Sequence, residues 1–174
     1  MAALPEDFLP ANVFPADLSE SISIAFLQLA QGAPGDPLAA FTSVLLIELG
    51  QRIVLNWLRD AGRTLPPSSP DESEAHLQLT DIRGKTVSAR VFTRAAREAS
   101  GDTAFPLEAG SIQGINIFVV FGNTPAQPLF SLENTSIAGW LSDRNLRELG
   151  IPRQLPDIRL SQLRPPLELL PFLS

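Results

Sequence analysis

Apolar residues recur at helical spacing from Asp36 to Gly62 and surround most of the helix that they predict. One stripe contains Leu38, Phe41, Leu45, Leu49, Ile53 and Trp57, and a second contains Val44, Ile47, Val54 and Leu58. Asp36 is a favourable N-cap residue, the proline after it suits the first helical position, and Gly62 suits the helix end. A helix that is apolar on nearly every side is buried on several sides. We therefore expect the rest of the chain or another subunit to cover the second stripe, and we assign its four residues as a candidate partner interface.

A second helical pattern lies between Asp17 and Gly32, with its apolar residues on one face. The link to the long helix is short, which favours an antiparallel helix pair over residues 17–62. The longer helix also has the length of a membrane span. Because Glu48 and Arg52 stand near its centre, where charge is costly in a bilayer, we expect no membrane role.

After a linker of prolines, serines and acidic residues at positions 63–75, the pattern changes to the alternation that is typical of strands. Two alternating runs flank Arg83-Gly84 and predict a β-hairpin. Residues 111–121 are apolar on both faces and predict a central strand. The sequence also predicts a strand over residues 129–132 and a short helix from Ser142 to Leu149.

Both ends of the chain carry prolines at intervals that forbid a long regular helix. Residues 1–16 and 151–174 nonetheless contain many large apolar side chains, so we expect extended arms that lie on this chain or on a neighbouring subunit. The whole pattern predicts an α+β fold in a single domain, residues 1–174. An N-terminal helix pair packs on a mostly antiparallel sheet of four to five strands over residues 76–150, with proline-rich extended arms at both termini.

The inventory of catalytic side chains is small. The chain has no cysteine and no tyrosine, and His76 is its one histidine, so we expect no metal site and no cofactor. No complete phosphate-binding or dinucleotide-binding motif is present. The remaining candidates for acid–base chemistry are Glu98, Asp102, Glu108 and Asp143, whose spacing brings no two of them together. The sequence therefore favours a protein that is not an enzyme.

Charge is distributed unevenly along the chain. The net charge is −6, and residues 1–75 carry ten acidic residues against three arginines. Nucleic-acid binding needs a basic footprint, so we expect no nucleic-acid partner. One basic cluster stands out because no acidic residue lies between positions 82 and 98; it contains Arg83, Lys85, Arg90, Arg94 and Arg97. This cluster is a candidate site for an anion or an acidic partner, or for the chain's own acidic first part.

These observations predict a non-catalytic protein–protein interaction or structural assembly protein that binds a partner or forms homo-oligomers. The first residues lack the basic charge of a targeting segment, so a cytoplasmic location, including an assembled particle, is expected. An alternative is a small-ligand-binding domain with a pocket between helix and sheet, near Trp57, Phe118 or Trp140. A third interpretation is a hydrolase that uses paired carboxylates.

Overall fold

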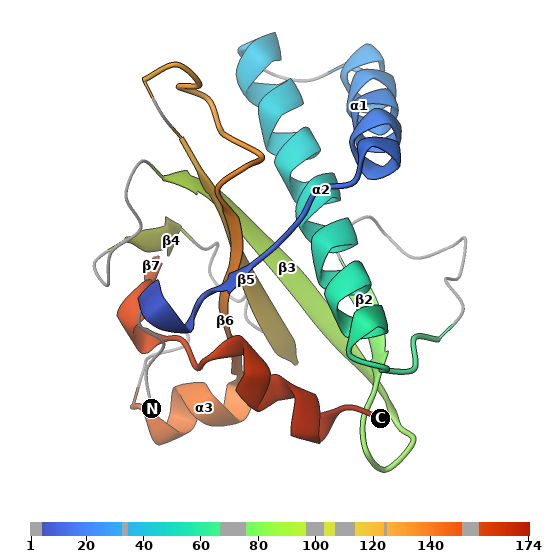
Figure 1. Cartoon of the computed structure of the whole chain (residues 1–174), viewed down its shortest axis with the longest axis vertical. Helices are drawn as coiled ribbons and strands as arrows, with labels where there is room; N and C mark the ends of the chain where they lie inside the picture. Colours follow the sequence, from blue (N-terminus) through green and yellow to red (C-terminus); the bar gives the residue numbers. More distant parts are fainter. Residues whose placement is uncertain are drawn as a thin grey trace.

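The computed structural model describes residues 5–32, 35–66, 76–96, 103–106, 114–123, 125–150 and 157–174, and these form an α+β fold (Figure 1). The helices are α1 (Pro15–Ala30), α2 (Pro37–Asp60) and α3 (Asp143–Glu148), with 3-10 turns η1 (Pro5–Asp7), η2 (Leu160–Gln162) and η3 (Pro166–Phe172). The strands are β1 (Leu9–Pro10), β2 (His76–Thr80), β3 (Thr86–Ala96), β4 (Ala104–Pro106), β5 (Ile115–Gly122), β6 (Thr135–Ser142) and β7 (Asp157–Arg159). The predicted helix pair and β-hairpin are both confirmed, and each forms within a few residues of its expected bounds.

The main sheet has five strands in the order β1-β6-β5-β3-β2. β3 and β5 are parallel, and the other neighbours are antiparallel, which confirms a mostly antiparallel sheet. The β2–β3 hairpin turns at Gly84, whose φ of 75° suits a residue without a side chain. β4 and β7 form a separate antiparallel pair. β3 is longer than its hairpin partner: β2 pairs with β3 as far as Arg90, whereas β5 pairs with β3 as far as Ala96.

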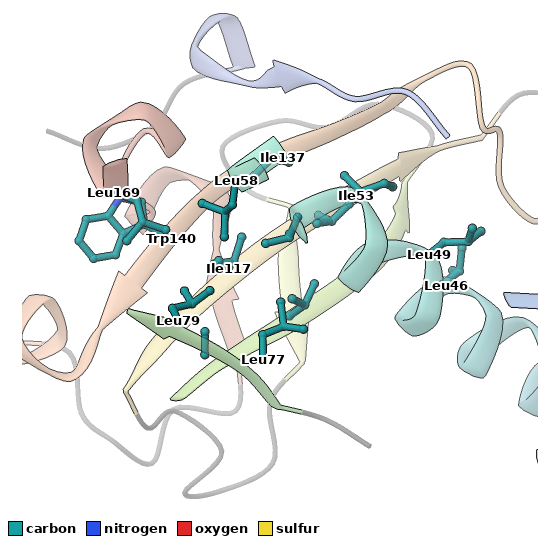
Figure 2. Packing of buried hydrophobic residues seen from close by; sticks show 14 of the residues in the cluster. Leu46, Leu49, Ile53, Leu58, Leu77, Leu79, Ile117, Ile137, Trp140 and Leu169 are labelled. Atoms are coloured by element: carbon teal, nitrogen blue, oxygen red, sulfur yellow. The ribbon is translucent and has the colours of Figure 1, made fainter. Parts of the chain in front are cut away.

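The sheet is covered on both faces. Ile117, Val119 and Phe121 of β5 pack toward α2, and Phe118 and Val120 pack toward the other side, as expected for a central strand. Figure 2 shows side chains of α2 lying over those of the strands in the first of these two cores. The second core is closed by β4, β7, η2 and α3. Each large apolar side chain that is buried in this way contributes about 1.5–3 kcal/mol, so the two cores hold the layers together.

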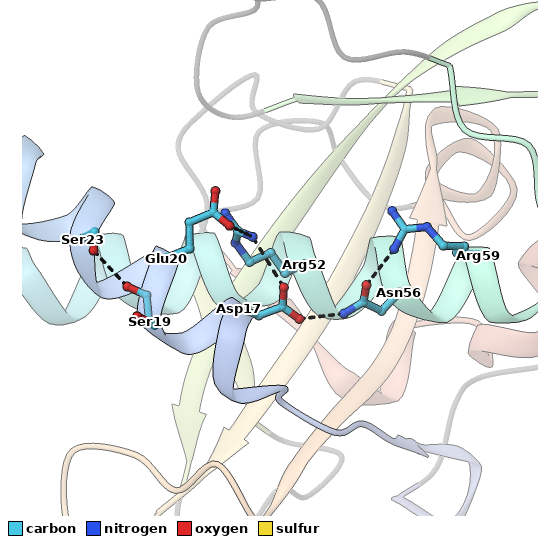
Figure 3. A network of polar contacts seen from close by, with 7 residues as sticks. All are labelled: Asp17, Ser19, Glu20, Ser23, Arg52, Asn56 and Arg59. Atoms are coloured by element: carbon cyan, nitrogen blue, oxygen red, sulfur yellow. Dashed lines mark hydrogen bonds and ion pairs between the residues drawn. The ribbon is translucent and has the colours of Figure 1, made fainter.

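Helix α1 is attached to the outer side of α2 by a polar network (Figure 3). The Arg52 guanidinium donates to Asp17 at 3.5 Å and to Glu20 at 2.9 Å, and the Asn56 amide donates to Asp17 at 2.8 Å. Burial opposes the charge of Arg52, but its hydrogen bonds and ion pairs with the two carboxylates outweigh this effect and raise the pKa of Arg52. The network fixes the position of α1, whose own buried residues are few.

The described parts of both arms pack on the domain itself. In the N-terminal arm, Leu9 and Pro10 pair with β6 at the edge of the sheet, where the missing N–H of a proline is tolerated. The C-terminal arm reaches further into the structure and buries Leu160, Leu163, Leu169 and Leu173. It passes so close to β6 that a Cβ atom at Gly139 would lie 2.5 Å from the Arg164 carbonyl oxygen. The described part of the C-terminal arm is therefore a structural part of the domain.

The prediction of a strand over residues 129–132 is wrong. This segment is irregular, and the next strand along the chain is β6, which begins at Thr135. The register of β6 against β5 shifts between Phe118 and Val119, where the partners pass from Gly139 to Ile137. Such a bulge changes the side-chain alternation. As a result, Ile137 and Trp140 face the same core although their positions differ by an odd number, and the sequence shows no regular period there.

Candidate functional site

The N-terminal part of α2 stands away from β3 and leaves a cavity of about 630 Å³, which we call the α2–β3 groove. One wall is formed by α2 residues Leu38, Ala39, Thr42, Ser43, Leu46 and Ile47, with Asp36 at the start of the helix. The other wall is formed by β3 residues 90–95, and Pro106 and Leu129 complete the lining. The groove is therefore bounded by elements from the helix layer, the sheet and the second sheet.

A glycine in the middle of α2 explains where the groove begins. A Cβ atom at Gly50 would overlap the Thr93 methyl group and would lie 3.3 Å from a methyl group of Val91. The helix can approach β3 so closely because position 50 has no side chain. From this contact the two elements diverge toward the N-terminal end of α2 (Figure 1). The groove occupies the space that this divergence opens.

The groove runs along the edge of β3. Successive side chains of a strand point to opposite faces, so a cavity above one face would be lined by every second residue. Here the lining contains the consecutive residues 90–95. Arg90 is the last residue of β3 that pairs with β2, and no described strand pairs with the outer side of the residues after it, 91–95. The groove therefore gives access to backbone groups as well as to apolar side chains.

Charge differs between the two walls. Asp36 caps α2, and its carboxylate accepts hydrogen bonds from the backbone N–H groups of Leu38 and Ala39. On the opposite wall, Arg90 and Arg94 are half-buried. Arg94 makes no hydrogen bond or ion pair with any residue that the structure describes. The hydroxyl groups of Thr42 and Ser43 add neutral polar positions to an otherwise apolar helix wall.

The predicted basic cluster is divided by the structure. Arg83 and Lys85 are exposed in the hairpin turn, where their backbone N–H groups donate to the Asp81 carboxylate. Arg90 and Arg94 line the α2–β3 groove. Arg97 lies outside the described residues. The sequence therefore identified two residues of the groove, and it grouped them with two that lie at the other end of β3.

The candidate interface on α2 is divided in the same way. Val54 and Leu58 are fully buried by this chain, so in this structure they are core residues and are not accessible to a partner. Val44 is half-buried against the same core. Ile47 is half-buried and lines the groove. The remaining groove residues of α2 gave no separate signal, because they continue the same apolar pattern.

The positions that were suggested for a ligand pocket differ from the observed cavity. Phe118 is fully buried in the second core. Trp140 is buried and contacts Phe172 and Arg164, whose guanidinium carbon lies 5.5 Å from the centroid of the Trp140 ring. Trp57 lines a separate cavity of about 140 Å³ beside the N-terminal arm. None of these three aromatic residues lines the α2–β3 groove.

Of the candidate catalytic residues, the structure describes the surroundings of Asp143 alone. Asp143 is the first residue of α3, whereas Glu98, Asp102 and Glu108 lie outside the described residues, as does the side chain of His76. Within the described ranges, no group of three or more acidic, histidine or cysteine side chains is placed to hold a metal ion. The structure brings no two of the four candidate carboxylates together among the residues that it describes.

Helix α2 satisfies the length and composition of a membrane span, with a mean hydropathy of 1.6 over its most apolar window. In the structure it lies across the sheet, and its buried residues belong to one hydrophobic cluster with residues of β2, β3, β5 and β6. The comparison with known proteins found no matching family model, no matching curated protein and no matching solved structure.

Proposed function

We propose that this chain is a non-catalytic interaction protein whose α2–β3 groove receives a segment of a protein partner. The observation that carries this proposal is the lining of the groove by consecutive residues of β3, of which residues 91–95 lie beyond the last residue that pairs with β2. An uncovered strand edge offers unpaired N–H and C=O groups, and proteins use such edges to bind other chains. The apolar wall of α2 adds side-chain contacts beside that edge.

A photo-crosslinking experiment tests this proposal. The photoreactive residue p-benzoylphenylalanine is placed at Ser43, an exposed position in the groove, and the protein is irradiated in the cells that naturally produce it. The matched control places the same residue at Ser161, which is exposed on η2, beyond the second core. We expect a covalent protein adduct of defined mass from position 43 and none from position 161. Equal yields from both positions, or no adduct at position 43, would contradict the proposal.

A small-molecule ligand is the second candidate for the same groove. Its volume of about 630 Å³ falls within the roughly 300–1,000 Å³ of typical ligand pockets. Native mass spectrometry of the protein purified from its own host distinguishes the two. A bound non-protein mass that is lost on denaturation, and lost in a Ser43→Trp variant but retained in Ser161→Trp, would favour this candidate over a protein segment.

Self-association forms part of the same proposal, because α1 presents large apolar side chains to solvent. Phe26 and Leu27 are 59% and 66% exposed, and Leu38 at the start of α2 is 56% exposed. The Phe26 ring lies 4.8 Å from that of Phe41, so this apolar surface continues from α1 onto α2. Contiguous exposed apolar patches are typical of interaction sites. Light scattering after size exclusion is expected to show an oligomer that a Phe26→Ser/Leu27→Ser variant reduces to monomer; a monomeric wild-type protein would remove this part of the proposal.

A further inference from the structure

We propose that the α2–β3 groove binds an extended segment in which apolar and acidic residues alternate, and that this segment pairs as an added strand with residues 91–96 of β3. The proposal rests on the proposed function and specifies the chemistry of the partner. Its acidic side chains lie on the side of Arg90 and Arg94, and its apolar side chains lie against α2.

The backbone of β3 sets the length of the bound segment. β5 pairs with one side of residues 91–96, and no described strand occupies the other side. At about 3.3 Å per residue, this edge is roughly 20 Å long. An added strand of about six residues would satisfy the backbone groups that face the groove. The groove therefore fits a short extended peptide.

The two sides of β3 set the pattern of side chains. Val91 and Thr93 point toward α2, since Val91 belongs to the core under the helix and Thr93 lies against Gly50. Arg90 and Arg94 alternate with them and point to the other side. In an added strand the side chains alternate in the same way. Every second residue of the segment would therefore contact the apolar wall of α2, and the residues between them would approach the arginines.

Charge decides which of these positions are acidic. Arg94 has no hydrogen bond or ion pair with a described residue, so a carboxylate of the partner can pair with it without displacing one of these groups. Asp36 stands at the end of the α2 wall and disfavours acidic side chains on that side. Carboxylates are thus attracted to one side of the added strand and repelled from the other.

A defined peptide tests the proposal on the full-length protein. The probe is a fluorescein-labelled six-residue peptide of alternating valine and glutamate with blocked ends, and binding is measured by fluorescence anisotropy. A peptide with lysine in place of glutamate is the control. We expect the glutamate peptide to bind, and the lysine peptide to bind about tenfold more weakly, because each exposed ion pair changes affinity by up to about fivefold and the peptide offers more than one glutamate. Equal affinities would overturn the charge assignment.

Charge reversal in the protein sharpens this test. Arg94→Glu is expected to lower the affinity of the protein for the glutamate peptide and to raise its affinity for the lysine peptide. The matched control is Arg144→Glu on α3, a side chain that is 84% exposed and lies outside the groove. A reversal of preference in both variants would indicate a general charge effect and would contradict binding in the groove.

Strand addition is tested by changing the peptide and leaving the protein intact. N-methylation of the peptide amides that face β3 removes their hydrogen bonds, whereas N-methylation of the alternate amides does not. Two peptides that are methylated in the two alternate sets are expected to differ at least tenfold in affinity. Equal binding of the two would exclude a strand.

Neutralising the chain's own acidic residues, in an Asp71→Asn/Glu72→Gln/Glu74→Gln variant, is expected to leave the affinity for the glutamate peptide unchanged. A gain in affinity would show that these residues compete for the edge and would overturn the proposal of a partner segment.

The outcomes separate this inference from the proposed function. A protein adduct at position 43 together with no binding of either peptide would retain the interaction groove and remove the strand-addition model. Absence of both the adduct and peptide binding would remove both.

Discussion

The two ends of α2 have the same apolar character and different environments. From Leu45 to Leu58 the helix contributes seven buried residues to the core, whereas between Pro37 and Val44 it contributes none. The C-terminal part of α2, which includes Gly50, lies on the sheet, and the N-terminal part stands over the groove. The difference shows that the apolar pattern of a helix does not by itself determine which part of its surface is covered, and that the strands beneath it do.

Among the changes considered, removing residues 151–174 should lower the stability of the domain the most. The deletion takes four buried leucines out of the two cores and removes the hydrogen bond from the Ser174 N–H to the Thr80 carbonyl. Loss of a single buried leucine side chain already costs about 2–5 kcal/mol, which is a large part of the stability of a domain. We expect no cooperative unfolding transition in a calorimeter. The control is Leu167→Ser in the same arm, where the side chain is 57% exposed and the transition should persist. A truncated chain that still melts cooperatively would show that the arm is not structural.

Leucine-to-alanine substitutions at the two ends of α2 test the comparison directly. Leu58 is fully buried, so Leu58→Ala should lower the free energy of unfolding by about 2–5 kcal/mol. Leu38 is largely exposed in this chain, so Leu38→Ala should change it by less than about 0.5 kcal/mol. Urea denaturation of the two variants measures both values. A similar loss from both would mean that the N-terminal end of α2 is as well covered as the rest.

The sign of the effect of Gly50→Ala tests whether the helix is held at this position. In a helix that is free of contacts, replacing glycine by alanine stabilises by about 0.5–1 kcal/mol. Here the new methyl group would overlap Thr93, and overpacking of this kind costs about 1–3 kcal/mol. We therefore expect destabilisation in thermal melts, together with a shift of α2 away from β3. Stabilisation by alanine would show that the close contact does not set the start of the groove.

The smallest effect should come from the polar network that holds α1 beside α2. Replacing Arg52 by methionine removes its bonds to Asp17 and Glu20 and should cost about 1 kcal/mol, because the pairs are only partly buried. Arg59→Met, which loses one exposed bond to Asn56, is the matched control and should cost less. The raised pKa of Arg52 means that its stabilising charge is present at every pH below its ordinary value and is lost only as the pH rises through the folded-state value. Arg52→Met should therefore exceed Arg59→Met in its loss of unfolding free energy by as much at pH 9 as at pH 7. A smaller excess at pH 9 would contradict a charged Arg52 as the source of the stabilisation.

The candidate site was only partly predictable from the sequence. Ile47, Arg90 and Arg94 were identified from an apolar stripe and from a run of basic residues, and all three line the groove. Val54 and Leu58 belong to the same stripe, and their burial depends on the sheet beneath them. A periodic pattern shows which residues share a helix face, but it does not show how far along the helix that face is covered.

Local signals in the sequence determined several elements of the fold. The N-cap at Asp36, the turn at Gly84 and the capping residue Ser142 act within a few positions of the chain, and each stands where it was expected. The two-sided apolar pattern of β5 likewise predicted a strand that is covered on both faces. Such features depend on backbone conformation and on residues that are near in sequence, which makes them readable before the fold is known.

Tertiary structure alone decided the rest. Three features join residues that are distant in sequence: the parallel pairing of β3 with β5, the bulge that disturbs the alternation in β6, and the packing of the described parts of both arms on the domain. The α2–β3 groove results from the same long-range pairings, because β2 pairs with β3 only as far as Arg90 while β3 continues to Ala96, and because α2 touches β3 at Gly50. A strand edge is defined by which strands pair, and the amino-acid pattern of one strand does not contain that information.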